Sequence, residues 1–192
     1  MGRLRTCVAA VAVLLAMVTG CGRSGSDSPE AAAPPPSVWP LPDDPRAAAQ
    51  KAGLAMLDRE MLAVHYHAHL DVLVRGVRVT VPAGVGIDAR RHLISALHTH
   101  DTTGIVHIES AEDIPFRLGQ FFTEWGQPLS ATRVGPVTVA GGEELRVYRN
   151  GERVSGDPAA LKFTQHAQIV VWLGPAGDSP KVPSSYDFPA GA

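Results

Sequence analysis

Residues 97–109 read Leu-His-Thr-His-Asp-Thr-Thr-Gly-Ile-Val-His-Ile-Glu, a pattern typical of a β-hairpin. The segment 101–104, Asp-Thr-Thr-Gly, supplies the turn. Asp can bond its own backbone, and Gly accepts the positive φ that ends many tight turns. The apolar, β-branched residues after the turn favour a strand. The stretch therefore predicts two antiparallel strands that carry several histidines close to one turn.

The register of this hairpin decides where its histidines point. With a four-residue loop, His98 lies opposite His107 and His100 lies opposite Ile105. Directly opposed residues have Cβ atoms about 4.5–5.5 Å apart, and His98 and His100 share a face because side chains alternate along a strand. The sequence thus predicts three imidazoles on one patch, with Glu109 further along it. A three-residue loop would instead place His107 on the other face.

A second group of histidines, His65, His67 and His69, alternates along an earlier predicted strand. His65 and His69 are roughly 13 Å apart along such a strand. This spacing excludes a tetrahedral site built from this strand alone, since a histidine reaches about 6.5 Å from Cα to a metal. A site therefore takes two neighbours from one strand and its other ligands from another. His67 and His69 with His166 or Asp71 form a further option.

These observations define the candidate metal ligands of the chain. They are His98, His100, His107, His65, His67, His69 and His166, with Asp101, Glu109 and Asp71 as supporting groups that orient the ligands. Imidazole with carboxylate suits Zn(II), Cu(II), Ni or Fe, and outside the cytosol Zn and Cu are the usual candidates. An exposed His-x-His pair can also be incidental, and His92 is expected on the surface.

The first 21 residues predict export and lipid anchoring. A short basic start is followed by an apolar segment, residues 8–18, that is too short for a comfortable membrane span of about 20 residues. It ends in Val18-Thr19-Gly20-Cys21, which resembles the lipobox of bacterial lipoproteins. The resemblance implies removal of residues 1–20 and diacylation of Cys21, on the extracytoplasmic face of a cell membrane. A cleaved secretory signal with an incidental Cys is the alternative.

Removal of residues 1–20 changes the cysteine count and the charge. Cys7 leaves with the signal and Cys21 carries lipid, so no disulfide or thiolate ligand remains. The mature chain keeps 15 Lys and Arg against 19 Asp and Glu, a formal charge of −4. This balance does not favour nucleic-acid binding, which calls for a basic patch. We therefore expect the membrane and a metal ion as partners; the sequence identifies no protein partner.

Composition divides the mature chain into three parts. Residues 21–42 are rich in Pro, Ser and Gly and predict a flexible linker that holds a domain off the membrane. Residues 43–174 form one His-rich domain, and residues 175–192 are expected to be poorly ordered. The domain opens with a helix that Asp44 caps and that is expected to run to Leu62.

The periodic segments of the domain predict an α+β fold. Hairpins are expected at 64–81, 93–109 and 145–154, with Val72 opposite Val79 in the first, and a last strand over 166–173. Leu118, Phe121, Phe122 and Trp125 have helical spacing and are expected in the core. The pattern favours a mostly antiparallel sheet with one packed amphipathic helix, in a roll or β-grasp-like arrangement. A cupredoxin-like β-sandwich is the alternative.

Three blocks of the sequence resemble an uncharacterised family of secreted or lipid-anchored prokaryotic proteins. The blocks are His-Tyr-His-Ala-His-Leu at 65–70, the stretch 97–109, and Phe-Arg-Leu-Gly-Gln-Phe-Phe-Thr-Glu-Trp-Gly at 116–126. The likeness covers most of residues 64–174. It implies a common domain and brings no established activity, so function is inferred from the residues.

The residues favour a lipid-anchored, extracytoplasmic protein that sequesters or delivers Zn(II) or Cu(II). Two alternatives remain open. Three histidines on a sheet also suit an enzyme in which a metal lowers the pKa of a bound water, with Glu109 as general base. The other alternative is a module that mediates interactions at the cell envelope and binds no metal. We favour binding over catalysis and assign no catalytic residue, because the sequence shows no nucleophile motif and no substrate pocket.

Overall fold

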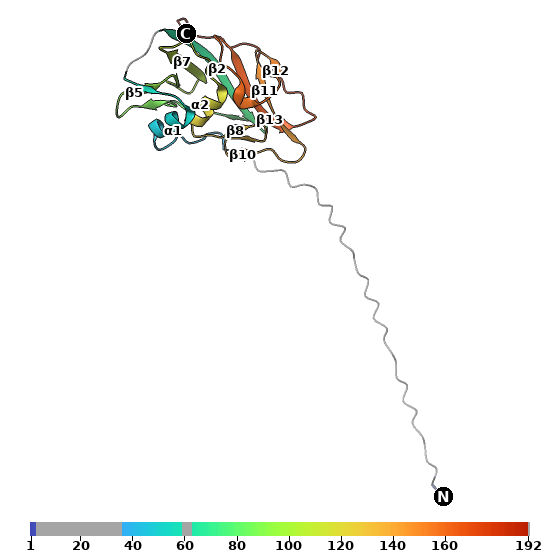
Figure 1. Cartoon of the computed structure of the whole chain (residues 1–192). Helices are drawn as coiled ribbons and strands as arrows, with labels where there is room; N and C mark the ends of the chain where they lie inside the picture. Colours follow the sequence, from blue (N-terminus) through green and yellow to red (C-terminus); the bar gives the residue numbers. More distant parts are fainter. Residues whose placement is uncertain (3–35, 59–62, 192) are drawn as a thin grey trace. The chain divides into compact units, whose positions relative to one another are not determined.

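The computed structural model describes residues 1–2, 36–58 and 63–191, and the folded part belongs to the compact unit Ala33–Ala192. A seven-stranded sheet dominates it (Figure 1). The strands in spatial order are β12 (Glu152–Val154), β11 (Glu143–Arg149), β13 (Gln168–Pro175), β2 (Val64–Val74), β7 (Ile105–Ser110) and β6 (Leu97–His98), with β3 (Val77–Val79) paired to β2. β13 and β2 are parallel, and the other pairs are antiparallel. The fold is therefore α+β with mostly antiparallel strands, as predicted.

Smaller elements complete the unit. One three-stranded sheet contains β1 (Met56–Leu57), β5 (Leu93–Ser95) and β4 (Ile87–Asp88). Another contains β10 (Val137–Thr138), β9 (Arg133–Val134) and β8 (Leu129–Ser130). The helices are α1 (Pro45–Ala52), α2 (Leu118–Glu124) and the 3-10 turn η1 (Pro158–Ala160). β5 thus pairs outside the main sheet, so the hairpin predicted for 93–109 retains only β6 and β7 there.

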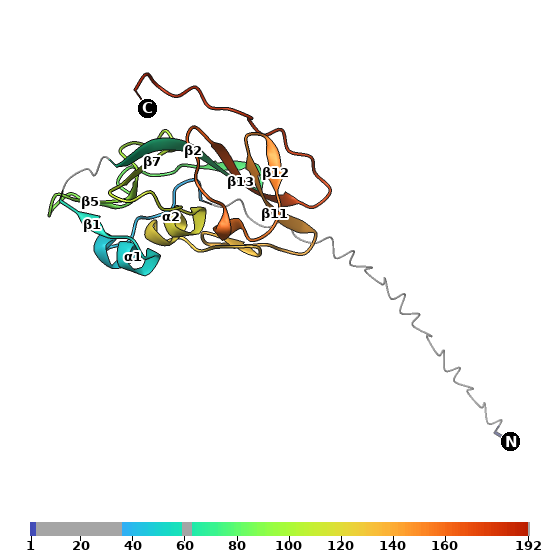
Figure 2. The ribbon, with the colours of Figure 1, turned by 45° about the horizontal axis from the view of Figure 1, so that its top comes forward.

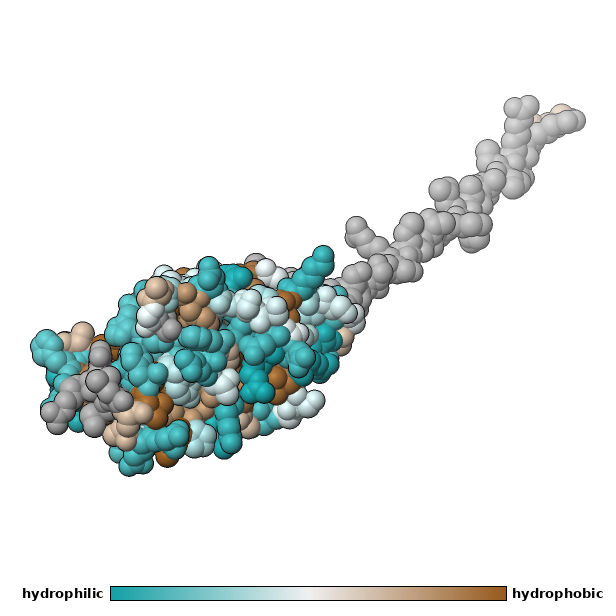
Figure 3. All heavy atoms as spheres, turned by 90° about the horizontal axis from the view of Figure 1, so that it is seen from above, coloured by the Kyte–Doolittle hydropathy of each residue, from teal (hydrophilic) through white to brown (hydrophobic). Residues whose placement is uncertain are grey.

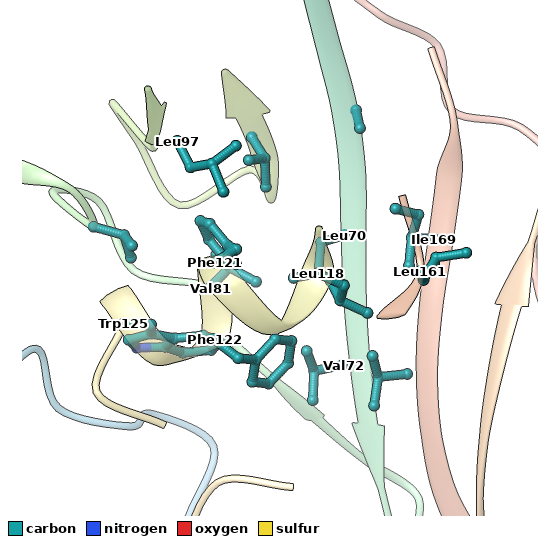
Figure 4. Packing of buried hydrophobic residues seen from close by; sticks show 14 of the residues in the cluster. Leu70, Val72, Val81, Leu97, Leu118, Phe121, Phe122, Trp125, Leu161 and Ile169 are labelled. Atoms are coloured by element: carbon teal, nitrogen blue, oxygen red, sulfur yellow. The ribbon is translucent and has the colours of Figure 1, made fainter. Parts of the chain in front are cut away.

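Helix α2 packs its apolar stripe on one face of the main sheet (Figure 4). Leu118, Phe121, Phe122 and Trp125 are each fully buried, as their spacing predicted. They share one core with the alternate residues of β2 that face them, which are Ala68, Leu70, Val72 and Val74. Gly126 ends the helix with a φ of 78°. The opposite face of β2 therefore remains for the polar residues.

The local registers follow the predictions where two strands are joined by a tight turn. Val72 pairs with Val79 in the first hairpin, and Arg149 pairs with Glu152 in the third. Asn150 and Gly151 both have positive φ, as a two-residue turn between twisted strands requires. The first hairpin is shorter than expected, because β3 ends at Val79.

The first helix is also shorter than expected. It is capped by Asp44, whose carboxylate accepts hydrogen bonds from the backbone N–H groups of Arg46 and Ala47. It ends at Ala52 because Gly53 takes the left-handed conformation, with a φ of 72°. The extension to Leu62 was wrong for residues 53–58, and residues 59–62 lie outside the described part.

Both ends of the described domain contact its body. In the segment 37–42, which the composition assigned to the linker, Trp39 is 1% exposed and lies 5.5 Å from Trp125 between ring centroids. At the other end, where we expected little order, Tyr186 stacks on His69 with ring centroids 3.7 Å apart. Figure 2 shows the C-terminal segment (dark red) passing over β13, β2 and β7, on the side opposite α1 and α2. This segment covers part of the polar face.

On the face that Figure 3 shows, hydrophobic residues occur in small groups among hydrophilic ones. The large apolar residues that are most exposed within 36–58 and 63–191 are Val38, Leu41 and Ile114. No helix in the described part is both long and apolar enough to span a membrane.

Glu124, at the end of α2, should make stability depend on pH. Its side chain is fully buried, and this burial raises its pKa to about 8, with Ser95 offsetting part of the rise. The folded state then binds a proton that the unfolded state releases above pH 4.5, so stability falls as the pH rises from 4.5 through 8. The total loss is on the order of 5 kcal/mol. Glu124→Gln should therefore melt higher than the parent at pH 8.5 by a margin that shrinks at pH 5. Glu112→Gln, at an exposed site, is the control, and a margin independent of pH would contradict this account.

Candidate metal centre

The register of three neighbouring strands aligns the histidines across the sheet. In the β2–β7 ladder His67 lies opposite His107, and in the β7–β6 ladder His107 lies opposite His98. The predicted pairing of His98 with His107 is confirmed. The adjacency of β2 and β7 was not predicted from the sequence, and it joins the two histidine groups into one row.

Two further side chains extend this row. His65 lies opposite Glu109 in the β2–β7 ladder, and the His65 Nε2 atom is 3.3 Å from the Glu109 Oε1 atom. His100 follows the end of β6, and the predicted pairing of His100 with Ile105 is wrong because the strand stops at His98. The ring of His100 nevertheless contacts the ring of His107, with centroids 4.5 Å apart. Five histidines and one carboxylate therefore meet on the polar face.

The ligand atoms fall into two groups of three. We call His65, His67 and His107 the β2 triad, and His98, His100 and His107 the β6 triad; within each, the candidate ligand atoms lie within 4.8 Å of one another. The His98 and His100 Nε2 atoms are 3.2 Å apart, and the His67 Nε2 and His107 Nδ1 atoms are 3.0 Å apart. Nitrogens around a tetrahedral Zn²⁺ are about 3.3 Å apart. Both triads can hold a metal ion with small adjustments.

The hydrogen bond of His98 prepares its ring for ligation. The His98 Nδ1 atom lies 2.9 Å from the Ser95 carbonyl oxygen, which can only accept, so Nδ1 donates. In the neutral ring, Nε2 then carries the lone pair, and Nε2 is the atom that faces His100. Metal-ligating histidines usually make this type of bond with the nitrogen that does not bind the metal.

Burial keeps the central rings neutral. Desolvation is the main cause that lowers the pKa of His98 to about 4 and the pKa of His107 to about 3, and neighbouring imidazoles contribute to both. Desolvation also lowers the pKa of His67. Neutral imidazole is the form that binds metal. These three rings are therefore ready to act as ligands at neutral pH.

The cluster is open to solvent on one side. A cavity of about 310 Å³ is lined by four of its histidines, by Glu109, and by residues of the C-terminal segment. The four are His65, His67, His100 and His107. The remaining histidine, His98, is fully buried. An ion can thus reach the triads through this cavity.

Two predicted ligands lie outside both triads. The His69 Nδ1 atom is 2.8 Å from the Gln168 Oε1 atom, and the His69 Nε2 atom is 2.9 Å from the Thr103 carbonyl oxygen. Both ring nitrogens of His69 thus face hydrogen-bond acceptors, and His69 belongs to neither triad. The prediction that His166 begins the last strand is wrong. His166 lies in a turn before β13, where its ring stacks on Phe188.

The acidic residues also have separate roles. Asp71 accepts hydrogen bonds from Arg78 and Gln168 and so holds the residue that engages His69. Asp101 accepts from the backbone N–H and the hydroxyl of Thr103, which is the turn chemistry expected there. Glu109 is the acidic residue that joins the cluster. Its Oε1 atom lies 3.8 Å from both His98 Nε2 and His107 Nδ1.

Comparison with known proteins found no relative from which a function could be inferred. No protein-family model matches the chain, and searches of curated proteins and of solved structures found no match. The arrangement of side chains must therefore carry the functional argument.

The buried histidines predict a loss of stability in mild acid. In the unfolded chain they take up protons near pH 6.5, whereas burial keeps His98 neutral down to about pH 4. Stability is therefore fully present above pH 6.5 and falls as the pH drops toward 4, with a contribution on the order of 3 kcal/mol from His98. The Glu124→Gln protein lacks the opposing titration of Glu124. Its urea concentration at the unfolding midpoint should decrease when the pH is lowered from 7 to 4.5. A constant midpoint would rule out this contribution.

Proposed function

We propose that the protein binds a transition-metal ion, Zn(II) or Cu(II), through the histidine cluster of β2, β6 and β7. The observation that carries this proposal is the convergence of two three-histidine groups around His107. Imidazole ligands with one nearby carboxylate are a donor set that suits both ions.

We further propose that the domain works at the cell envelope, where Cys21 carries the lipid. The support is the order of basic start, apolar segment and Gly-Cys in the sequence. An exposed, open cavity suits an ion that must enter and leave, so the role is sequestration or delivery of the ion. The residues that would orient the ligands are Glu109 and the Ser95 carbonyl.

Metal-induced stabilisation tests the binding proposal. An ion that binds only the folded protein stabilises it in proportion to the logarithm of its concentration over Kd. Added Zn(II) or Cu(II) should raise the melting temperature of the wild-type protein by several degrees. His69→Gln and His166→Asn should keep this shift, because neither residue belongs to a triad. If these two variants lose the metal-induced shift and His107→Phe keeps it, the metal site lies outside the two triads.

His92→Asn is the matched control for all histidine substitutions. His92 is exposed and lies outside both triads. Its backbone has a φ of 54°, a conformation that Asn tolerates better than most residues. This variant should show the full metal-induced shift.

A metal-dependent hydrolase is the second candidate. It is favoured by the position of Glu109, which is buried and lies 3.8 Å from ligand nitrogens of the β6 triad. A carboxylate beside a metal ion that three histidines bind can act as general base toward a metal-bound water. A Zn(II)-dependent ester hydrolysis that Glu109→Gln abolishes without loss of bound metal would establish this activity.

A further inference from the structure

The two triads are not independent, because they share His107. Each contains one exposed ring, one buried ring and this half-buried shared ring. The exposed rings are His65 and His100, and both line the same cavity. The triads therefore overlap in space as well as in membership.

We propose that the cluster holds one ion that moves between the two triads without leaving the protein. This inference rests on the proposed metal binding and specifies its mode: two alternative positions for a single ion. An ion in the β6 triad has the two free imidazoles of the β2 triad beside it, and the reverse also holds.

Glu109 supports the exchange between the two positions. Its Oε1 atom is 3.3 Å from the Nε2 atom of His65 and 3.8 Å from the Nε2 atom of His98. One carboxylate oxygen thus lies within 4 Å of a ligand nitrogen in each triad. It can remain near the ion while one pair of imidazoles replaces the other.

The same features disfavour two ions at once. Full three-histidine coordination in both positions would require His107 to bind two cations. Both dications would also depend on the same Glu109 for charge compensation, and they would repel each other across a short distance within a partly buried site. The first ion bound should therefore weaken binding of the second.

This arrangement suits delivery better than long-term storage. When the incoming ligands are already in place, an ion can exchange ligands one at a time, and zinc can expand from four to five ligands. An ion that already alternates between two positions in an open cavity is accessible to a competing ligand from another molecule. The partner class that fits is therefore a second metal-binding protein or a chelating small molecule.

The exposed rings allow a test that leaves the core intact. His65→Gln removes one ligand from the β2 triad, His100→Gln removes one from the β6 triad, and the double variant breaks both. The full-length protein in detergent is titrated with Zn(II), and Cu(II) bound to it is examined by electron paramagnetic resonance. Circular dichroism confirms folding, and His92→Asn is the control.

The wild type should bind one ion per chain and show two Cu(II) signals. Each single variant should keep one ion and one of the two signals, with an affinity loss below about 10-fold, because the other triad remains. The metal affinity of the double variant should fall by more than about 100-fold. Replacing a residue that only orients the ligands already costs about 10–100-fold in metal affinity.

Other results would overturn the inference in distinct ways. Two ions per chain in the wild type would show independent sites. A single Cu(II) signal that only one of the variants abolishes would show that one triad alone is used. Neither result would affect metal binding itself. Failure of the wild type to bind either ion would overturn the proposed function as well.

Discussion

Replacement of His107 with phenylalanine is expected to abolish metal binding at both triads. His107 is the member common to the two groups, and phenylalanine keeps a planar aromatic ring at this half-buried position while it removes both nitrogens. The affinity for Zn(II) should fall by more than about 100-fold, which exceeds the cost of changing a supporting residue. The metal-induced rise in melting temperature should disappear, and isothermal titration should detect no saturable binding.

The fold should survive this substitution. The core that α2 forms with β2 lies on the other face of the sheet, and it contains none of the cluster histidines. The far-ultraviolet circular dichroism of His107→Phe should therefore match that of the wild type, and a cooperative melting transition should remain. Full metal stoichiometry in a folded His107→Phe protein would exclude the shared histidine as a ligand.

Replacement of Cys21 with alanine is expected to release the protein from the membrane. In the proposed lipoprotein, the diacylated Cys21 is the only lipid attachment, so its loss removes both acyl chains. A single chain binds membranes only marginally, and two chains anchor stably. Detergent phase partitioning should move Cys21→Ala from the detergent phase to the aqueous phase, and mass spectrometry should show no acylated N-terminus.

Cys7→Ala is the matched control, because Cys7 lies in the segment that the proposal removes. This variant should remain acylated and partition like the parent. If Cys21→Ala instead stays with the membrane and migrates like the parent, the lipoprotein proposal is wrong.

The sequence predicts the local structure of this domain well, where the signals are short in range. Val72 and Val79 flank a tight turn, and the alternation of apolar residues on either side leaves one self-consistent register. The stripe that contains Phe121 and Trp125 has a helical period, and both the helix and its burial in the core are confirmed. The opposition of His98 and His107 followed from loop length in the same way.

The remaining features depend on contacts between distant segments, which periodicity does not encode. The pairing of His67 with His107 joins residues 40 positions apart. It could have been suspected from the polar face of each strand, but alternation alone does not select the neighbour of a strand. The engagement of His69 by Gln168 and its stacking with Tyr186 are also long-range contacts, so the sequence could not separate this histidine from the five that meet on the polar face.

The sequence did contain a local indication of where the first helix ends, although the prediction extended the helix beyond it. Gly53 follows the last helical residue, where glycine commonly takes the left-handed conformation. The apolar residues beyond it have a spacing that also fits a helix, and that spacing outweighed the glycine in the prediction. Met56 and Leu57 instead pair with β5.

X-ray absorption spectroscopy of the metal-loaded, full-length protein tests the central claim most directly. The account predicts a first shell of nitrogen or oxygen atoms at about 2.0–2.1 Å from Zn(II), with three of them from imidazole rings. The outer-shell scattering that imidazole produces should be present in His92→Asn and absent in His107→Phe. A shell of oxygen atoms without imidazole scattering, or a protein that retains no metal after buffer exchange at neutral pH, would contradict it.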